Sequence, residues 1–440
     1  MNILLTSPSS DESQTLKSTH SQLTIALMPC DGLFEDFFDT VGVSFDIFRT
    51  ELTGGWMFNY IEALQLVGVQ VVLIFISSHV SETWRFRHEP TGATVCILPD
   101  SILHRAFRYS TYRMGVAKKG VIKSLDSYLV LPLVLLASEL KQQGVDAILF
   151  QDYENPSFDV CVLFGKLMQM PVFASFQGGC SQRSRFERPI RPFTLRASTG
   201  LIIGSKTEIQ RVSDRYQLPS QKLMQIFNPM DVTTWHPMDR KQARKMLGIS
   251  DHARVAISHG RIDIIHKGLD ILLEAWKQIC SELPNQELCL LLVGSGSDVQ
   301  ELDQCIASMQ ITNILWVNEY IRDRTLLWQY ISAADVYVLS SRYEGFPVAP
   351  IEAMTCKLPV VATDVNGIRD IFNEGEASGG IIVPCEDATA LAAALGRILD
   401  DTSLGHELGK RGRHRAEQAF SFEAIGKQMR NFIFKNEADK

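Results

Sequence analysis

The sequence predicts an α/β protein of two doubly wound domains, each a parallel sheet covered by helices. Two observations predict this class. The chain has 440 residues, more than one hydrophobic core usually supports. Short β-branched runs also alternate with helical patterns of ten or more residues along its length, which is typical of parallel sheets with helical crossovers.

The expected strands fall into two sets. In the first half they are Thr24–Met28, Gln70–Ile76, Ala147–Phe150, Val172–Ser175 and Leu201–Ile203, with Asn2–Leu5 as a further candidate. In the second half they are Arg254–Ser258, Leu288–Val293, Asn313–Val317, Val336–Ser340, Pro359–Ala362 and Gly380–Val383. The second set lacks apolar-polar alternation, as expected for strands buried on both faces.

A turn-rich segment at 227–237 separates the two sets. We therefore expect one domain over 1–235, a second over 236–420, and a helix over 421–440 that crosses back to the first. Two doubly wound domains usually turn the carboxyl ends of their strands toward a shared cleft, so a ligand site is expected there.

Composition excludes several function classes. The formal net charge is -7, so the chain as a whole has no cationic footprint for nucleic acid. The nine cysteines form no Cys-x-x-Cys pair, and we expect them to be reduced thiols in a cytoplasmic protein. The apolar runs at 67–76 and 129–137 are shorter than a membrane span of roughly 18 residues.

A basic pair follows the first strand of the second set. Arg261 and Lys267 are six residues apart, on a strand-end loop and at a helix start. Both side chains can converge there on one polyanion, and a diphosphate suits them. The alternative is a solvated basic turn, because Arg and Lys are mostly surface residues.

A more specific block spans 342–354. Glu344 lies in a loop with Gly345 and Pro347, and Glu352 lies in the first turn of a helix that Pro350 begins. Backbone amides beside a carboxylate suit the hydroxyls of a sugar joined to phosphate. Glu352 alone could be a helix-capping carboxylate, but that reading does not explain the other three residues.

Taken together, these blocks resemble the family 4 retaining glycosyltransferases, which have two Rossmann-like domains facing across a cleft (the GT-B type). The resemblance runs through nearly the whole chain. It includes Gly54-Gly55, Asn59–Leu64, Gly260-Arg261, Lys267-Gly268, Leu292–Gly296, the two glutamates Glu344 and Glu352, Pro359–Gly367 and Gly380–Pro384. Each block is weak alone, but their order along the chain makes the match specific.

The resemblance implies a role for each site residue. Arg261 and Lys267 would neutralise the donor diphosphate, Glu352 would bind the ribose, and Glu344 would hold a hydroxyl of the donor sugar. The first domain would bind the acceptor and the second the nucleotide sugar. The other donor-binding positions that it implies are Gly54, Gly55, Gly260, Gly294, Tyr320, Ile321, Gly345, Phe346, Pro347 and Val348.

One departure concerns the first domain. Many relatives carry a His where this chain has Gln151, and Gln177 likewise stands where His is common. A glutamine hydrogen-bonds but cannot carry a titrating proton. Either the reaction needs no such base, or Asp152 or Glu154 replaces it, or the protein is inactive. We favour the first reading, with Gln151, Glu344, Arg261 and Lys267 as the catalytic residues.

Substrates and competing classes follow from the same residues. The chain contains no Asp-x-Asp, so we expect neither a metal nor a cofactor, with the two cations replacing the ion. The expected reaction moves a hexose from UDP-glucose to a sugar or lipid-linked acceptor of exopolysaccharide or envelope polysaccharide. The alternatives are a catalytically silent sugar-nucleotide-binding protein, an epimerase or a phosphorylase.

Residues 104–123 are basic, with interleaved aromatics and no acid. They are a candidate for peripheral attachment to the cytoplasmic face of the inner membrane, and the alternative is a solvated helix face. A second basic segment, Arg183–Arg196, follows Gln177 and is a candidate border of the acceptor site.

Overall fold

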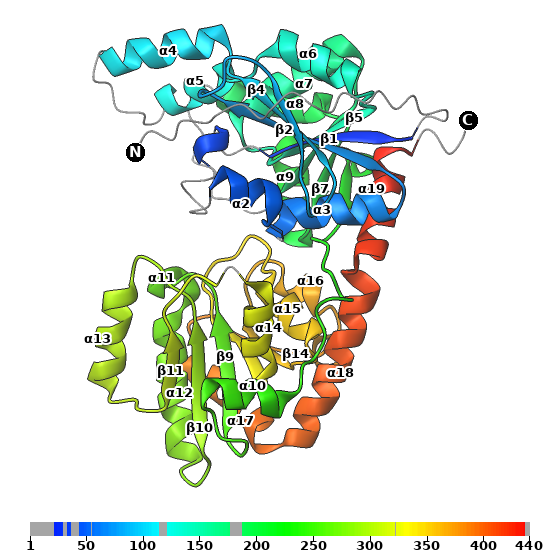
Figure 1. The fold of residues 1–440 in the computed structure, drawn as a ribbon. Coiled ribbons are helices and arrows are strands. Elements are labelled where there is room, and N and C mark those ends of the chain that lie inside the picture. The colour runs from blue at the N-terminus through cyan, green and yellow to red at the C-terminus, as the bar shows by residue number, and fades with distance from the viewer. Residues whose placement is uncertain are drawn as a thin grey trace. The chain divides into compact units, whose positions relative to one another are not determined.

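The computed structural model describes residues 22–29, 33–36, 44–53, 55–113, 121–176, 187–321 and 323–435. The chain divides into two compact units, which are described separately (Figure 1). The first unit comprises Met1–Ile203, Ile209–Ile226 and Ile425–Lys440, and the second comprises Gly204–Glu208 and Phe227–Ala424. The main part of the second unit thus begins at Phe227, before the expected boundary after 235. The chain returns to the first unit at Ile425, where 421 was expected.

The first unit contains an eight-stranded sheet with the order β3-β4-β2-β1-β5-β6-β7-β8. All neighbours are parallel except β3 and β4. The strands are β1 (Thr24–Met28), β2 (Gln70–Ser77), β3 (Trp84–Arg87), β4 (Thr94–Pro99), β5 (Ala147–Gln151), β6 (Val172–Phe176), β7 (Gly200–Ile203) and β8 (Leu223–Gln225).

Helices connect these strands. They are α2 (Phe45–Thr50), α3 (Gly55–Leu66), α4 (Ile102–Arg113), α5 (Val121–Leu129), α6 (Leu133–Gln142), α7 (Pro156–Met168), α8 (Glu187–Ala197) and α9 (Lys206–Tyr216). Because helices cover the sheet, central strands such as β1 are buried at every position, which explains their lack of alternation.

The last helix of the described chain, α19 (Phe422–Ile433), brings the chain back to the first unit. A Cβ on Gly426 would lie 2.1 Å from the carbonyl oxygen of Ala63, so only glycine permits this close approach to α3. Phe432 packs on Phe173 of β6, with ring centroids 5.5 Å apart. The C-terminal helix therefore completes the core of a unit that begins about 400 residues earlier.

The second unit contains a six-stranded parallel sheet with the order β11-β10-β9-β12-β13-β14. Its strands are β9 (Arg254–His259), β10 (Leu288–Val293), β11 (Ile314–Val317), β12 (Val336–Leu339), β13 (Val360–Thr363) and β14 (Gly380–Val383). Numbered within the unit, this is the order 3-2-1-4-5-6 of dinucleotide-binding sheets. The order reverses between β9 and β12, where such sheets bind ligands.

The helices of the second unit include one that carries an expected site residue, α15 (Ala349–Thr355), with Glu352 in its first turn. The others are α10 (Arg240–Leu247), α11 (Ile264–Lys267), α12 (Leu269–Glu282), α13 (Val299–Met309), α14 (Arg324–Ser332), α16 (Ile368–Ile371), α17 (Ala388–Asp400) and α18 (Thr402–Ala419).

The structure confirms the expected strands of both halves to within one residue at each end. It adds β3, β4 and β8, which the sequence did not indicate. The candidate strand Asn2–Leu5 lies outside the described residues, as does Gly54.

Candidate functional site

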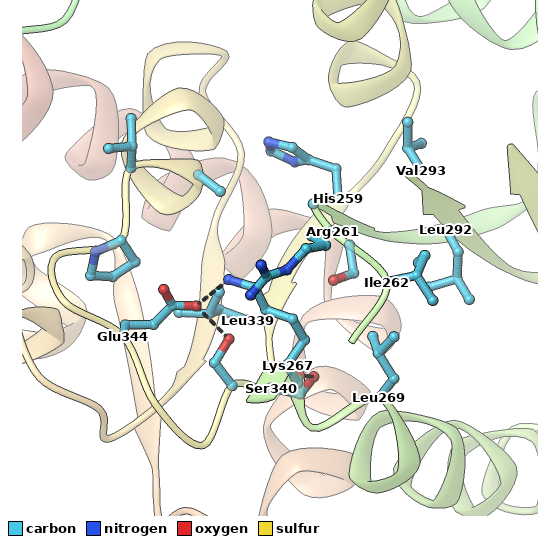
Figure 2. A pocket seen from close by; sticks show the side chains of 16 residues that line it. His259, Arg261, Ile262, Lys267, Leu269, Leu292, Val293, Leu339, Ser340 and Glu344 are labelled. Atoms are coloured by element: carbon cyan, nitrogen blue, oxygen red, sulfur yellow. Dashed lines mark hydrogen bonds and ion pairs between the residues drawn. The ribbon is translucent and has the colours of Figure 1, made fainter. Parts of the chain in front are cut away.

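A pocket opens at the carboxyl edge of the second unit's sheet, where β9 and β12 are neighbours (Figure 2). Its volume is about 270 Å³. We call it the β9/β12 pocket. Its polar lining residues are Ser258, His259, Arg261, Lys267, Ser340, Ser341 and Glu344. The pocket thus lies at the strand-order reversal, the position at which open α/β sheets bind ligands.

Two expected site residues meet directly in this pocket. Lys267 Nζ lies 2.7 Å from Glu344 Oε1 (Figure 2). Ser341 donates a hydrogen bond of 2.6 Å to the same carboxylate oxygen. Both charged side chains are mostly buried, with exposed fractions of 28% for Lys267 and 13% for Glu344. The second carboxylate oxygen and the remaining ammonium protons are therefore available to a guest.

Arg261 is the second expected cation of the pocket. It follows β9, and its side chain is 67% exposed, with Nη2 3.4 Å from Asp263 Oδ2. A hydrogen bond from the backbone amide of His266 holds the pKa of Asp263 below its usual value, so this carboxylate is charged near neutral pH. At 3.4 Å the Arg261–Asp263 contact is long, and the exposed guanidinium can turn toward an anionic ligand.

Arg342 fixes the loops that carry Lys267 and Glu344. Its guanidinium forms two bonds to Asp270, of 2.8 and 2.7 Å, and also binds Glu386. Hydrogen bonds to these two carboxylates raise its pKa, so the charge is permanent. The backbone adds a second tie, because Ser340 Oγ donates to the Lys267 carbonyl at 2.8 Å. These contacts therefore fix the positions of Lys267 and Glu344 before a ligand binds.

Close backbone packing shapes the other wall of the pocket. Gly294 has φ +142°, and a Cβ there would lie 1.9 Å from the carbonyl oxygen of Gly260. Gly260 itself has φ +144°, with open space where its Cβ would be. Both positions require glycine, and Gly294 acts by supporting the Gly260–Arg261 loop. Gly294 is not among the lining residues.

Glu352 contacts the pocket through a histidine that the sequence analysis did not single out. His259 lines the pocket, and its Nε2 lies 2.9 Å from Glu352 Oε2. Its side chain is 8% exposed, and its Nδ1 is buried without a hydrogen-bond partner among the described residues. The sequence signal that could have identified His259 is its position directly before the Gly260-Arg261 pair. Ser341 and Arg342, to which the sequence analysis gave no role, lie three and two residues before Glu344.

Contacts with Phe227 and Asn366 hold the loop after Glu344 in place. Pro347 and Val348 line the pocket, whereas the ring of Phe346 packs on Phe227 with centroids 5.4 Å apart. The amide group of Asn366 donates to the Gly345 carbonyl at 2.9 Å. Gly345 and Phe346 can therefore serve the site only through their backbone.

Other expected donor-binding residues, and the expected catalytic residue Gln151, do not line this pocket. Tyr320 is 69% exposed, and Ile321 packs against the core of the second unit. Gly55, with φ +68°, begins α3 in the first unit, and Gln151 ends β5 at the strand-order reversal of that sheet. Gln177 lies outside the described residues.

Part of the basic segment at 104–123 is internal. His104 is buried, with Nδ1 2.7 Å from Asp100 and Nε2 3.2 Å from Asp126. Burial lowers the pKa of His104, but these two carboxylates outweigh it and the net shift is upward. Arg105 pairs with Asp100 at 2.5 Å, and Arg108 donates to Ser78. The segment is therefore not a uniform cationic face, and residues 114–120 lie outside the described chain.

The described residues offer neither a cluster of metal ligands nor a single membrane-spanning helix. No three His, Cys, Asp or Glu side chains gather there as a metal site would require. No single described helix is long and apolar enough to cross a membrane, and α5 with α6 reach that length only as a pair bent by 43°.

Residues 239–415 match the family model described as glycosyl transferases group 1. A D-inositol 3-phosphate glycosyltransferase of Geodermatophilus obscurus is 30% identical over 230 residues, which are 51% of this chain and 49% of that protein. An alpha-maltose-1-phosphate synthase of Mycobacterium tuberculosis is 29% identical over 215 residues, 46% of this chain and 54% of its own. The chain spans about half the length of the curated relatives it matches.

Solved structures match the fold over nearly the whole chain. The sucrose-phosphate synthase of Thermosynechococcus elongatus has a TM-score of 0.67 at 21% identity, covering 95% of this chain and 100% of its own. HepE of Anabaena, solved in complex with UDP-glucose, has a TM-score of 0.65 at 15% identity, covering 95% of this chain and 100% of its own. Both likenesses extend across the two units, which confirms the predicted two-domain α/β fold. The chain carries a glycosyl transferases group 1 domain over residues 239–415.

Proposed function

We propose that the protein is a retaining hexosyltransferase that uses UDP-glucose without a metal ion. One observation carries the proposal: Arg261, Lys267 and Glu344 line one pocket at the strand-order reversal of a glycosyl transferases group 1 domain. The two cations suit the diphosphate of a nucleotide sugar, and the carboxylate beside them suits a hydroxyl group of its sugar. HepE, whose fold this chain shares, was solved with UDP-glucose, which makes that donor the first to test.

The chemistry follows from these charges. The bond between the anomeric carbon and the diphosphate oxygen breaks, and the leaving diphosphate gains negative charge that Arg261 and Lys267 stabilise. The acceptor oxygen forms its new bond to the same carbon on the same face, and its proton passes to the departing diphosphate oxygen. Because the leaving group takes the proton, Gln151 has only to position the acceptor by hydrogen bonding. The two cations supply the charge that a metal ion supplies elsewhere.

The test is turnover of UDP-glucose in the presence of EDTA. We expect slow release of UDP without an acceptor and faster release with a saccharide acceptor, and NMR of the product should show a retained anomeric configuration. A thermal-shift series of nucleotide sugars identifies the donor, because a ligand of the native state raises its melting temperature. Binding without turnover would instead support the catalytically silent alternative, and no response to any UDP or GDP sugar would refute the proposal.

We further propose that the acceptor is lipid-linked and that the first unit attaches to the cytoplasmic face of a membrane. The support is a set of exposed apolar and aromatic side chains on α4, which carries part of the basic segment, and on the first turn of α6. These side chains and their exposed fractions are Ile102 (84%), Leu103 (68%), Tyr109 (63%), Tyr112 (86%), Leu133 (36%), Val134 (85%) and Leu135 (41%).

The two helices that carry these side chains start close to each other. The start of α4 is tied to the segment before α6, because the amide of Ser101 donates to the Val130 carbonyl at 3.1 Å. Arg113 lies over the ring of Tyr109, 5.7 Å from its centroid. Tyrosine and arginine beside aliphatic side chains are typical of surfaces that enter the headgroup region of anionic bilayers.

Flotation with vesicles of phosphatidylcholine and phosphatidylglycerol tests the attachment. We expect Ile102→Ser/Val134→Ser to reduce the bound fraction at least tenfold, since each side chain loses roughly 1.5–3 kcal/mol of burial. The matched control is Leu167→Ser on α7, where the side chain is 83% exposed. Flotation of the double variant at the level of the control would contradict the attachment and leave the transferase proposal untouched.

A further inference from the structure

A second hollow lies in the second unit, at the opposite edge of the sheet from the β9/β12 pocket. Its volume is about 350 Å³. Ser332 precedes β12 and Leu358 precedes β13, so the hollow opens at the amino ends of the strands. We call it the amino-edge hollow. The helix α15 lies between the two sites, with Val348 before it at one pocket and Cys356 after it at the other.

The ionisable lining of this hollow, its cysteine apart, consists of arginine, lysine and histidine side chains. It comprises Arg240, Lys357, His406 and Lys410, with no Asp or Glu among the lining residues. The side chains of Lys357, His406 and Lys410 make no ion pair or hydrogen bond with any residue in the described ranges. A protein with a net charge of -7 thus gathers positive charge here, and only Arg240 among these four residues has a carboxylate partner in the described ranges.

A carboxylate in the neighbouring hollow already has its own partners. Asp335 lines a smaller hollow next to this one, which shares Arg240, Lys357 and His406. Its oxygens accept bonds from Arg240 at 2.7 Å, from Arg244 at 2.8 Å and from the amide of Val255 at 2.8 Å. Asp335 therefore carries one negative charge against the two positive charges of Arg240 and Arg244, and none is left for Lys357 and Lys410.

The packing of α18 holds these cations together. A Cβ on Gly409 would lie 2.0 Å from the Lys357 carbonyl oxygen, so this glycine lets α18 contact the turn that carries Lys357. His406 and Lys410 stand one turn apart on the same helix and line the hollow beside that turn. The cationic rim is thus built into the close packing of two elements.

We propose that the amino-edge hollow binds a small soluble anion that carries at least two negative charges, of the phosphate or diphosphate class. Arg240 offers a planar fork for phosphate oxygens, and the two lysines offer mobile point charges. Ser332, 4% exposed, adds a hydroxyl to the lining, which accepts from the Met238 amide at 3.2 Å. The volume is at the lower end of ligand pockets, roughly 300–1,000 Å³, and suits such a small guest.

Calorimetric titration with inorganic diphosphate at low ionic strength tests this site. The full-length Arg261→Ala/Lys267→Ala variant removes both cations of the β9/β12 pocket, so the outcome does not depend on the proposed transferase activity. We expect this variant to bind one diphosphate. Adding Lys357→Gly and Lys410→Ala should weaken that binding at least tenfold. Glycine suits position 357 because its backbone has φ +58°.

The matched control adds Lys166→Ala and Lys277→Ala instead, which remove two exposed lysines from α7 and α12. We expect the control to bind diphosphate as the parent variant does. The proposal fails if the parent variant binds no diphosphate, or if the Lys357→Gly/Lys410→Ala pair and the control pair have the same affinity.

Discussion

Lys267→Ala is expected to lower kcat/KM for the donor at least roughly 30-fold while the fold survives. The Lys267 ammonium lies 2.7 Å from Glu344 in a pocket where Arg261 is the other cation. Truncating one partner of a mostly buried, hydrogen-bonded charge pair costs about 2–5 kcal/mol, because the remaining charge is left unpaired. In this case the loss also removes stabilisation of the departing diphosphate.

Steady-state UDP release measures this effect, with melting temperature as the check on folding. Lys277→Ala, an exposed lysine of the same unit, is the matched control and should retain full activity. Lys267→Arg keeps the charge and should recover part of the rate, which separates charge from packing. A rate for Lys267→Ala within threefold of the wild type would remove Lys267 from the catalytic site.

Arg191→Ala should cost the first unit about 3–5 kcal/mol of unfolding free energy. Arg191 is 0% exposed, with Nη2 3.2 Å from Asp159 Oδ2 and 3.5 Å from Glu187 Oε2. It also donates to the Tyr153 carbonyl. Removing it leaves two buried carboxylates without a cation, which is more costly than losing a pair at the surface.

The same variant should respond to pH in a defined direction. Burial raises the pKa of Asp159, and Arg191 opposes that shift. Without Arg191 the pKa of Asp159 rises further above its unfolded value, so the folded state binds a proton that the unfolded state releases. The destabilisation by Arg191→Ala is therefore largest at pH values above the pKa that Asp159 has in the folded variant. It shrinks as the pH falls through that pKa.

Urea unfolding of the full chain at several pH values measures both effects. The exposed Arg188→Ala, on the same helix α8, is the control, and it should change stability by no more than about 0.5 kcal/mol. An unfolding free energy for Arg191→Ala within about 1 kcal/mol of the wild type would show that the buried ion cluster contributes little net stability.

Most of the fold was predictable because buried parallel strands are continuous apolar runs. The strands Leu288–Val293 and Gly380–Val383 match their predicted bounds at both ends. The strand β3, in contrast, has four residues with alternating arginines and becomes a strand only by antiparallel pairing with β4. Such pairing is a tertiary contact that local sequence does not encode. The three-residue β8 is too short to give any pattern.

The candidate site was predictable where residue type and spacing both carry the chemistry. Arg261, Lys267 and Glu344 line one pocket although 77 residues separate Lys267 from Glu344. The supporting residues were not predictable, because their function depends on partners that are distant in sequence. His259 meets Glu352 across 93 residues, and Arg342 meets Asp270 across 72. Tyr320 and Ile321 were expected at the donor, but they lie outside the pocket lining.

The position of α19 bears on how this chain is synthesised. A ribosome synthesises residues 227–424 before it synthesises the part of α19 whose Gly426 and Phe432 pack into the first unit. The half that emerges second can thus finish folding first, which reverses the usual N-terminal order of co-translational folding. Until α19 is translated, the first unit lacks part of its core. We therefore expect a chaperone that binds exposed apolar surface to stay on the first unit longest.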